Sequence, residues 1–266
     1  MGIVLRNNGL GGKLKFSGAS SGGFRTTYIS TTPSIVTSGL VLNLDASNPS
    51  SYSGSGTNWN DLSGNGNNGS LVNGPTYSSD NGGSIVFDGT NDYIAITNPS
   101  TIRNQNFTIS VWINPGIQNA AIISIIDFDH SFTPNQGFVM QSEDALTNKY
   151  FYFAWHDGSV FQPTGGGGFG VGKGIQITTS VWQNITYSKN GTTLLGYKNG
   201  SQIYTGTASS SNVNYIANKN MRLAAVGTDF SRNFKGGYPN TLIYSRALSA
   251  AEILQNYNAQ KSKFGL

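Results

Sequence analysis

The stretch from Val181 to Gly206, VWQNITYSKNGTTLLGYKNGSQIYTG, decides the fold class. It contains three short runs of strand-forming residues, separated by the pairs Asn190-Gly191 and Asn199-Gly200. Asn-Gly is the strongest short-range hairpin signal, because a type I′ turn needs positive φ at both central residues. The stretch therefore predicts a three-strand antiparallel meander.

The first run also shows how such strands would be buried. Alternation along a strand places its side chains in two sets, Val181, Gln183, Ile185 and Tyr187 against Trp182, Asn184, Thr186 and Ser188. One face can therefore meet a core.

Short strands continue along most of the chain. They are expected in Gly39–Ser47, twice in Ser84–Ile96 around Gly89–Asn91, and in Phe107–Pro115, Ala120–Phe128, Phe138–Gln141, Tyr150–Trp155, Ile175–Thr178, Met221–Val226 and Thr241–Tyr244. Residues 48–84 are rich in Asn, Gly and Ser and predict loops around at most one or two short strands. This spacing favours a β-sandwich.

One helix is expected, at the end of the chain, from about Ala250 to Ala259. Ser249 is a good N-cap, and Glu252 completes a capping box. Leu248 can pack against Ile253 as a hydrophobic staple.

Composition bounds the class of protein. The 266 residues, with 37% hydrophobic residues and 35 glycines, suit one large all-β domain. Without cysteine there are no disulfides or thiolate metal sites. The net charge of +4 is spread over few charged residues with no basic run, so we expect no nucleic-acid partner.

Neither a membrane span nor an export signal is expected in this sequence. No apolar run approaches the roughly 18 residues that span a bilayer, so we expect no membrane insertion. The first residues, MGIVLRNNGLGGKLKFSG, lack a long apolar region and a small-residue cleavage site, so no signal peptide is expected.

Residues 1–37 differ in composition from the rest. Glycines alternate with scattered basic residues, and Pro33 lies near the end of the segment. This composition predicts either a flexible leader or an extended arm that orders on a partner. The expected organisation is an arm over 1–37 and a single domain over 38–266.

Several stretches together resemble the concanavalin A-like, laminin G-like jelly-roll domains. They are SIVFDGTNDYIAI, FTISVWINP, VWQNITYSKNGTTLLGYKNGSQI and FKGGYPNTLIYSRALSAAEI, within residues 39–258. The last is the most specific, with Phe234, Gly236, Tyr244, Arg246, Ala247, Leu248, Ser249 and Glu252 filling the family's closing pattern. The resemblance implies an all-β jelly-roll sandwich with an extended N-terminal arm and a short C-terminal helix. Pro239 and Asn240 replace an Asp-Glu pair that many members carry.

The resemblance raises the question of catalysis, because the family includes glucanases. Retaining glycoside hydrolysis needs two carboxyl groups roughly 5 Å apart. The only glutamates are Glu143, in a polar loop, and Glu252, assigned to the helix cap. We therefore expect no enzyme activity.

A narrower likeness is to versions of the domain found in bacteriophage particles. The run GLVLNLDASNPSSYSGSGTNWNDLSGNGNNGSLVNG and the ending YNAQKSKFGL resemble that subgroup. The resemblance implies a structural protein on the virion surface, in the capsid or tail, anchored to other virion proteins through residues 1–37. A homo-oligomer, with a trimer as the expected state, and a cell-surface glycan are its other expected partners. The alternative is a free glycan-binding lectin.

Glycan binding needs an exposed aromatic ring beside polar groups, because the apolar face of a sugar stacks on the ring. Trp155, His156 and Asp157 end a predicted strand in this way, and Trp59 lies in a polar loop. The sequence predicts these four as glycan contacts, with core packing as the alternative for the tryptophans. Trp112 and Trp182 are expected in the core.

We expect no required cofactor, and the sequence offers one candidate calcium site. Asp61, Asn65 and Asn67 in one loop, and Asp88 and Asp92 in the next hairpin, supply oxygens of the kind Ca²⁺ takes. The alternative is that they form Asx-turns without an ion. A second set, Asp127, Asp129 and His130, is expected to cap a strand end.

Two further patterns are not expected to be sites. Gly167–Gly174, GGFGVGKG, approaches a phosphate-binding loop but ends in glycine and leads into a strand. His130 and His156 have no nucleophile beside them.

Overall fold

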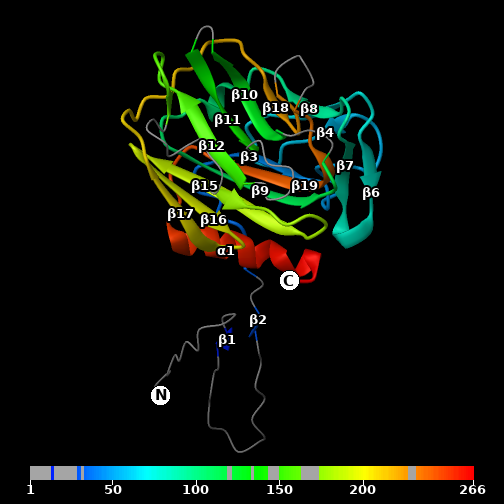
Figure 1. Cartoon of the computed structure of the whole chain (residues 1–266). Coiled ribbons are helices and arrows are strands. Elements are labelled where there is room, and N and C mark those ends of the chain that lie inside the picture. The colour runs from blue at the N-terminus through cyan, green and yellow to red at the C-terminus, as the bar shows by residue number, and fades with distance from the viewer. Residues whose placement is uncertain are drawn as a thin grey trace, which may run out of the picture.

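The computed structural model describes residues 13–14, 29–30, 33–118, 122–132, 135–142, 150–162, 174–226 and 232–266. Two large antiparallel sheets stack face to face, and one short helix lies against the outer face of the second sheet (Figure 1). The predicted all-β sandwich with a C-terminal helix is confirmed.

Sheet I has nine strands in the order β13-β12-β11-β10-β18-β8-β5-β4, with β14 also paired to β12. Their bounds are β4 (Asn58–Trp59), β5 (Gly69–Val72), β8 (Tyr93–Ile96), β10 (Ser124–Phe132), β11 (Asn135–Ser142), β12 (Tyr150–His156), β13 (Phe161–Gln162), β14 (Ile175–Gln176) and β18 (Met221–Leu223).

Sheet II has eight strands in the order β17-β16-β15-β9-β19-β7-β6, with β3 also paired to β19. Their bounds are β3 (Leu40–Asp45), β6 (Thr76–Ser78), β7 (Ser84–Asp88), β9 (Phe107–Pro115), β15 (Gln183–Asn190), β16 (Thr193–Lys198), β17 (Ser201–Thr207) and β19 (Lys235–Tyr244). The remaining elements are the strand pair β1 (Lys13–Leu14) and β2 (Ile29–Ser30), helix α1 (Ala250–Gln260), and the 3-10 turns η1 (Asp80–Gly82), η2 (Ser100–Ile102) and η3 (Lys261–Phe264).

The predicted meander is present as β15, β16 and β17, which pair in sequence order. Asn199 and Gly200 are the central residues of the second turn and both have positive φ, 51° and 77°, as a type I′ turn requires. In the first turn Asn190 pairs with Thr193, so Gly191 is the first central residue and Asn190 still belongs to the strand. The first turn therefore lies one residue later than predicted.

Strand β19 is longer than predicted because it begins at Lys235 rather than Thr241. Its first half pairs with β7 up to Tyr238, and its second half pairs with β3 from Asn240. Pro239 lies where the partner changes, and proline, which has no N–H to donate, is tolerated at such a break in a ladder. Pro239 and Asn240 are both buried in this strand.

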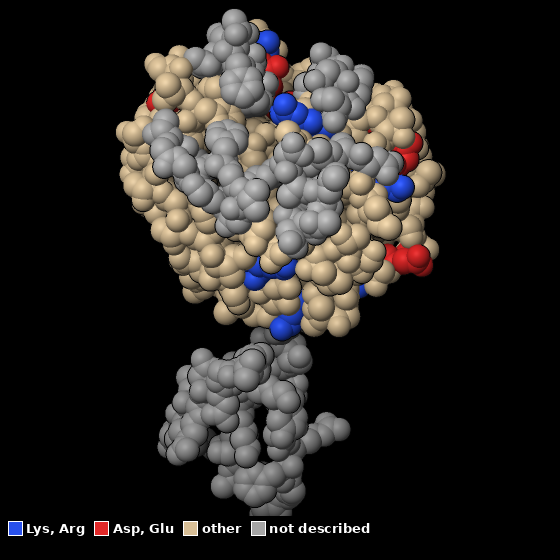
Figure 2. Space-filling model, viewed as in Figure 1, with Lys and Arg blue, Asp and Glu red and all other residues tan. Residues whose placement is uncertain are grey.

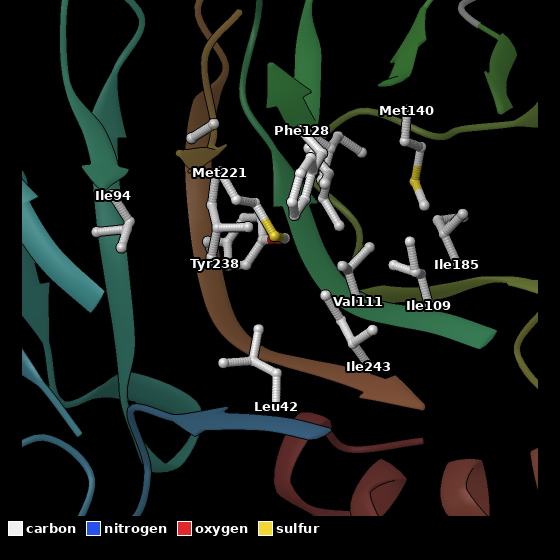
Figure 3. Close-up of a cluster of buried hydrophobic side chains, with 14 of the residues drawn as sticks. Leu42, Ile94, Ile109, Val111, Phe128, Met140, Ile185, Met221, Tyr238 and Ile243 are labelled. Carbon is white, nitrogen blue, oxygen red and sulfur yellow. The ribbon is translucent and has the colours of Figure 1, made fainter. Parts of the chain in front are cut away.

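The core fills the space between the two sheets (Figure 3). Alternation along the strands sends Ile109, Val111 and Ile243 of sheet II toward Phe128 and Met221 of sheet I. These side chains are at most 1% exposed. Burial of this kind contributes about 25 cal/mol per Å² of apolar surface, which makes the core the main source of stability.

The outer face of sheet II is also buried, but its side chains are mostly polar. Asn184 Nδ2 donates to Ser110 Oγ at 3.0 Å, and Thr186 Oγ1 donates to the same oxygen at 2.8 Å. Thr108 Oγ1 accepts the N–H of Leu248 at 2.8 Å, just before α1. Helix α1 can therefore cover a polar face because the polar groups bond to one another and to the chain that enters the helix.

The capping box predicted for this helix is confirmed. Ser249 Oγ accepts the N–H of Glu252, and the Glu252 carboxylate accepts the N–H of Ser249 at 2.8 Å. Arg246 adds two bonds to the carboxylate, at 3.1 and 2.6 Å. The guanidinium of Arg246 and the N–H of Ser249 lower the pKa of Glu252 to about 2.

The packing of the sandwich includes residues that the sequence analysis placed in the arm. Val36 is 9% exposed and packs in a small apolar cluster with Leu248 and Ile253. Its N–H donates to Asn256 Oδ1 at 2.8 Å, and its carbonyl accepts the hydroxyl of Tyr244 at 2.9 Å. The sandwich thus begins a few residues before 38.

The surface carries few charges. On the face shown in Figure 2, lysine, arginine and acidic side chains are scattered among uncharged residues. Within the part of the chain that the structure describes, no helix is long and apolar enough to cross a membrane.

We expect E252Q to lower the free energy of unfolding at pH 7 by about 1–2 kcal/mol, because it removes the charged partner of a half-exposed arginine. Since the pKa of Glu252 is lower in the folded chain than its ordinary 4.5, its contribution is present above about pH 4.5 and is lost as the pH falls toward 2. Urea unfolding at several pH values tests this. Wild type should lose more stability than E252Q across that window, and parallel losses would contradict the assignment.

Candidate functional site

A pocket of about 310 Å³ opens on the outer face of sheet II, at the end of the sheet that includes β6 and η1. Its walls combine one tryptophan with several hydroxyl and amide side chains. The residues that line it are Ser78, Asp80, Asn81, Ser84, Val86, Asn114, Pro115, Gly116, Ser180, Trp182, Gly236 and Gly237.

The floor of the pocket is a row of residues that crosses the sheet. Val86 of β7 pairs with Gly237 of β19, which in turn pairs with Asn114 of β9. Continuing the register in which Gln183 pairs with Ile113 places Trp182 opposite Asn114. Residues in such a row share one face of the sheet, so their side chains point to the same side.

Gly237 makes room for the ring of Trp182. A Cβ at this position would lie 2.8 Å from Cη2 of Trp182, closer than side chains approach one another. The adjacent Gly236 has a φ of 135°, and its Cβ would lie 2.2 Å from the carbonyl oxygen of Asn114. Gly237 therefore leaves room for the indole beside β19, and Gly236 lets β19 pass close to the backbone of β9.

Aromatic packing holds the ring of Trp182 from behind. Phe264 of η3 lies 5.0 Å from it, measured between ring centroids, and 4.2 Å from Trp112. Trp112 stacks on Tyr257 of α1 and donates its indole N–H to Gln260 at 2.7 Å. The C-terminal segment thus fixes the tryptophan of the pocket.

The rim is polar and accessible. Asp80, Asn81 and Ser180 are exposed, and Asn114 is partly exposed beside Trp182. Asn81 has a φ of 52°, a conformation that asparagine tolerates, at the turn that carries Asp80 to the rim. Among the described residues Asp80 forms no ion pair, so its carboxylate can accept hydrogen bonds from a ligand.

The structure does not support two of the predicted glycan contacts. Trp59 and Trp155 are both 0% exposed and belong to the core between the sheets. The ring of Trp59 packs edge-on against Tyr52, and the ring of Trp155 lies 4.9 Å from the Lys189 ammonium. The prediction of exposed rings at these positions is wrong, because the inward face of each strand carries the tryptophan.

The other two predicted glycan contacts, His156 and Asp157, interact with residues of the turn and strand that follow them. His156 is 1% exposed and packs edge-on against Phe161; burial lowers its pKa, against the opposing effect of Asp157. Partial burial alone would raise the pKa of Asp157, but the N–H groups of Val160 and Ser159 lower it overall. The carboxylate therefore stabilises the turn after β12.

The residues of the predicted calcium site do not converge. Asp61 accepts the N–H groups of Asn43, Ser63 and Asn67 and the hydroxyl of Ser63, so all its lone pairs are used. Asn67 donates to Val41 and Thr101, and Asn65 donates to Leu40 and Ser63. These bonds favour the Asx-turn alternative.

The other two residues of the predicted calcium site, Asp88 and Asp92, lie away from the loop that carries Asp61, Asn65 and Asn67. In the β5–β8 ladder Gly69 pairs with Ile96 and Val72 with Tyr93, so Asn67 and Asp92 lie beyond opposite ends. The ladder alone separates them by roughly 10 Å at about 3.3 Å per residue. Asp92 accepts the N–H of Asp88, and Asp88 accepts that of Thr90. Within the described ranges no three acidic or histidine residues form a metal-binding group.

The two aspartates of the second acidic set each lie near a basic side chain. Asp127 lies 4.0 Å from Arg222, and Asp129 lies 3.3 Å from Lys219. Glu143, the side chain of His130 and all but the last residue of Gly167–Gly174 lie outside the described residues.

Trp182 is the candidate contact residue that the sequence did not reveal, because a tryptophan in a strand is expected in the core. A signal was available: Trp182 shares its face with Asn184, Thr186 and Ser188, which is the polar face of the strand. Trp112 is buried as predicted, although it lies under α1 rather than between the sheets.

The sequence from residue 88 to residue 254, more than half of the chain, matches the concanavalin A-like lectin/glucanases superfamily. The chain belongs to this superfamily. None of the curated proteins matches the sequence.

Several solved structures have a fold similar to that of this chain. Domain 4 of AbnA, a GH43 extracellular arabinanase from Geobacillus stearothermophilus in complex with arabinotriose, has a TM-score of 0.60 at 19% identity, covering 82% of this chain and 98% of that domain. The binding domain of botulinum neurotoxin DC, in complex with SialylT, has a TM-score of 0.59 at 14% identity and covers 84% of this chain. The same domain in complex with rat synaptotagmin II has a TM-score of 0.62 at 15% identity. This chain spans about half the length of the neurotoxin domains, at 52%. At these identities the likeness shows a common fold.

We expect W155A to lower the free energy of unfolding by about 3–5 kcal/mol, because it leaves a cavity in the core beside Lys189. W155F, which keeps a ring, should cost less. Urea unfolding of wild type and both variants measures the free energy of unfolding. An unchanged midpoint for W155A together with a loss of sugar binding would restore Trp155 as a ligand contact.

Proposed function

We propose that this chain is a non-catalytic carbohydrate-binding module that holds a sugar ring against Trp182. The observation that supports the proposal is the partly exposed indole on the floor of a polar pocket. The fold of the chain is also that of domains solved in complex with arabinotriose and with SialylT.

The chemistry of the pocket suits a sugar. The apolar C–H face of a pyranose can stack on the indole, while its hydroxyls need partners of both kinds. Asn81 and Asn114 offer donors and acceptors, and Asp80 offers acceptors. The volume of about 310 Å³ lies at the lower end of small-molecule sites and suits one or two sugar rings.

The same pocket is poorly equipped for glycoside hydrolysis. That reaction uses a pair of carboxyl groups, roughly 5 Å apart in retaining enzymes and further apart in inverting ones. Asp80 is the only acidic residue among those that line the pocket. The proposal is therefore binding without cleavage.

We expect W182A to reduce affinity for a bound glycan by at least tenfold, because the sugar ring loses its stacking surface when the indole is removed. F264A should weaken binding less, since Phe264 only supports the indole. A glycan array identifies the ligand, and calorimetry then compares the variants.

The matched control is V181A, an exposed neighbour that does not line the pocket. It should bind as wild type does. If W182A remains folded by circular dichroism and binds glycan unchanged, the pocket is not the site.

We also propose that this module is displayed on a bacteriophage particle, with the N-terminal arm as its anchor. Support comes from the resemblance of residues 39–74 and of the ending YNAQKSKFGL to phage particle proteins, and from the glycine-rich arm. On a virion, a glycan-binding module would serve adhesion to the host surface, and a homotrimer would raise its avidity. A free lectin is the alternative.

We expect deletion of residues 1–32 to abolish incorporation into particles while glycan binding persists. The deletion stops before Pro33 so that Val36 keeps its packing against Leu248 and Ile253 and its hydrogen bond to Asn256. Mass spectrometry of purified particles from the source culture measures incorporation. Sedimentation of the full-length and shortened chains tests whether the arm holds the oligomer together.

An arm of the same length with a shuffled sequence is the control, and it should fail like the deletion. If the shortened chain enters particles as wild type does, the arm is not the anchor. If the full-length chain is absent from particles, the virion proposal fails and the free lectin replaces it.

A further inference from the structure

The pocket contains a single charge. Asp80 is exposed on the rim, and every other residue that lines the pocket is uncharged. No lysine or arginine is among the lining residues. A ligand in contact with the rim therefore meets one negative charge without a positive charge in the wall.

Two lysines lie close to the pocket, but neither is among its lining residues. Lys263 passes near Gly82 of η1, but its ammonium donates to Asp45 at 3.0 Å and to Ser47 at 2.6 Å. The stem of Lys235 packs along Gly89 and Gly116 at one side of the pocket, and Lys235 is not a lining residue. The wall of the pocket therefore holds no positive charge from either lysine.

We propose that the pocket selects uncharged sugars and rejects acidic ones, with Asp80 as the discriminating residue. The inference rests on the proposed function, since it concerns the sugar that lies on Trp182. A neutral sugar donates hydroxyl hydrogens to Asp80, and such bonds to a carboxylate are stronger than bonds to a neutral acceptor. A uronic or sialic acid places its own carboxylate near that of Asp80, and like charges without a shared cation repel.

The chemistry of Asp80 also limits which part of the sugar it contacts. A carboxylate accepts hydrogen bonds only, through two oxygens in one plane. Two neighbouring hydroxyls of a sugar can donate to both oxygens at once, which a carboxylate-bearing edge cannot do. The edge of the ring that faces Asp80 is therefore a neutral diol, while the asparagines accommodate the remaining groups.

The test uses pairs of sugars that differ only at C6, as CH₂OH or carboxylate. β-Glucosides are compared with β-glucuronides, and β-galactosides with β-galacturonides, on an array and then by calorimetry at low salt. We expect wild type to prefer the neutral member by about 3- to 10-fold, the range for one like charge a few ångströms away in a partly solvated site. High salt should reduce the preference, because the charges are exposed.

D80N keeps the shape of the side chain and removes its charge. It should weaken binding of the neutral sugar several-fold, because a charged acceptor becomes a neutral one, and bring the preference close to unity. K235Q is the matched control at the neighbouring lysine and should leave the preference as it is in wild type. Thermal unfolding of both variants checks that the fold is retained.

The outcomes separate the two proposals. If wild type binds the acidic member as well or better, or if D80N leaves the preference unchanged, the role of Asp80 is overturned while glycan binding stands. If K235Q abolishes binding of acidic sugars that wild type accepts, selection against charge is also overturned. If wild type binds no sugar at all, the proposed function itself fails.

Discussion

Strand β19 is the element on which the rest of this structure depends, because one proline divides it into two halves with different partners. Before Pro239 the strand pairs with β7, and after it the strand pairs with β3. Strand β9 pairs with both halves across a shift in register. Proline has no N–H to donate and is tolerated at such a break in a ladder. The two halves of β19 contribute to different parts of the structure.

The second half leads directly into the C-terminal helix. Tyr244 ends the strand, and the chain then passes through Arg246 to the cap at Ser249. The cap turns α1 back over the outer face of the same sheet, where Trp112 donates its indole N–H to Gln260 and Thr108 accepts the N–H of Leu248 just before the helix. A polar face can be buried here because its groups are hydrogen-bonded, which removes most of the cost of taking them from water.

The first half of β19 forms the floor of the pocket. Gly236 and Gly237 lie in it side by side, and the missing side chain at Gly237 is the space that Trp182 occupies. Phe264 then joins this tryptophan to the aromatic residues under the helix. The C-terminal segment therefore both completes the fold and fixes the one aromatic ring that the pocket presents to a ligand.

Solved structures that share this sandwich differ in what they are bound to, as the complexes with arabinotriose, SialylT and synaptotagmin II illustrate. At these identities the likeness shows the fold alone, so the choice of ligand has to come from the chemistry of a particular surface. In this chain that chemistry is one indole, several amides and hydroxyls, and one carboxylate.

The sequence by itself determined the fold class, the meander from β15 to β17 and the capped helix, because alternation, Asn-Gly turns and the capping box are local patterns. It did not determine which tryptophan is accessible. Trp59 lies in a polar stretch of sequence and Trp155 near the end of a strand, yet both point into the core. Trp182 lies on the outer face and remains partly exposed. Accessibility depends on what covers each face of a sheet, and that cover comes from segments far away in the chain. The row of Val86, Gly237, Asn114 and Trp182 exists only because four strands pair in one register, so the pocket was decided by the tertiary structure alone.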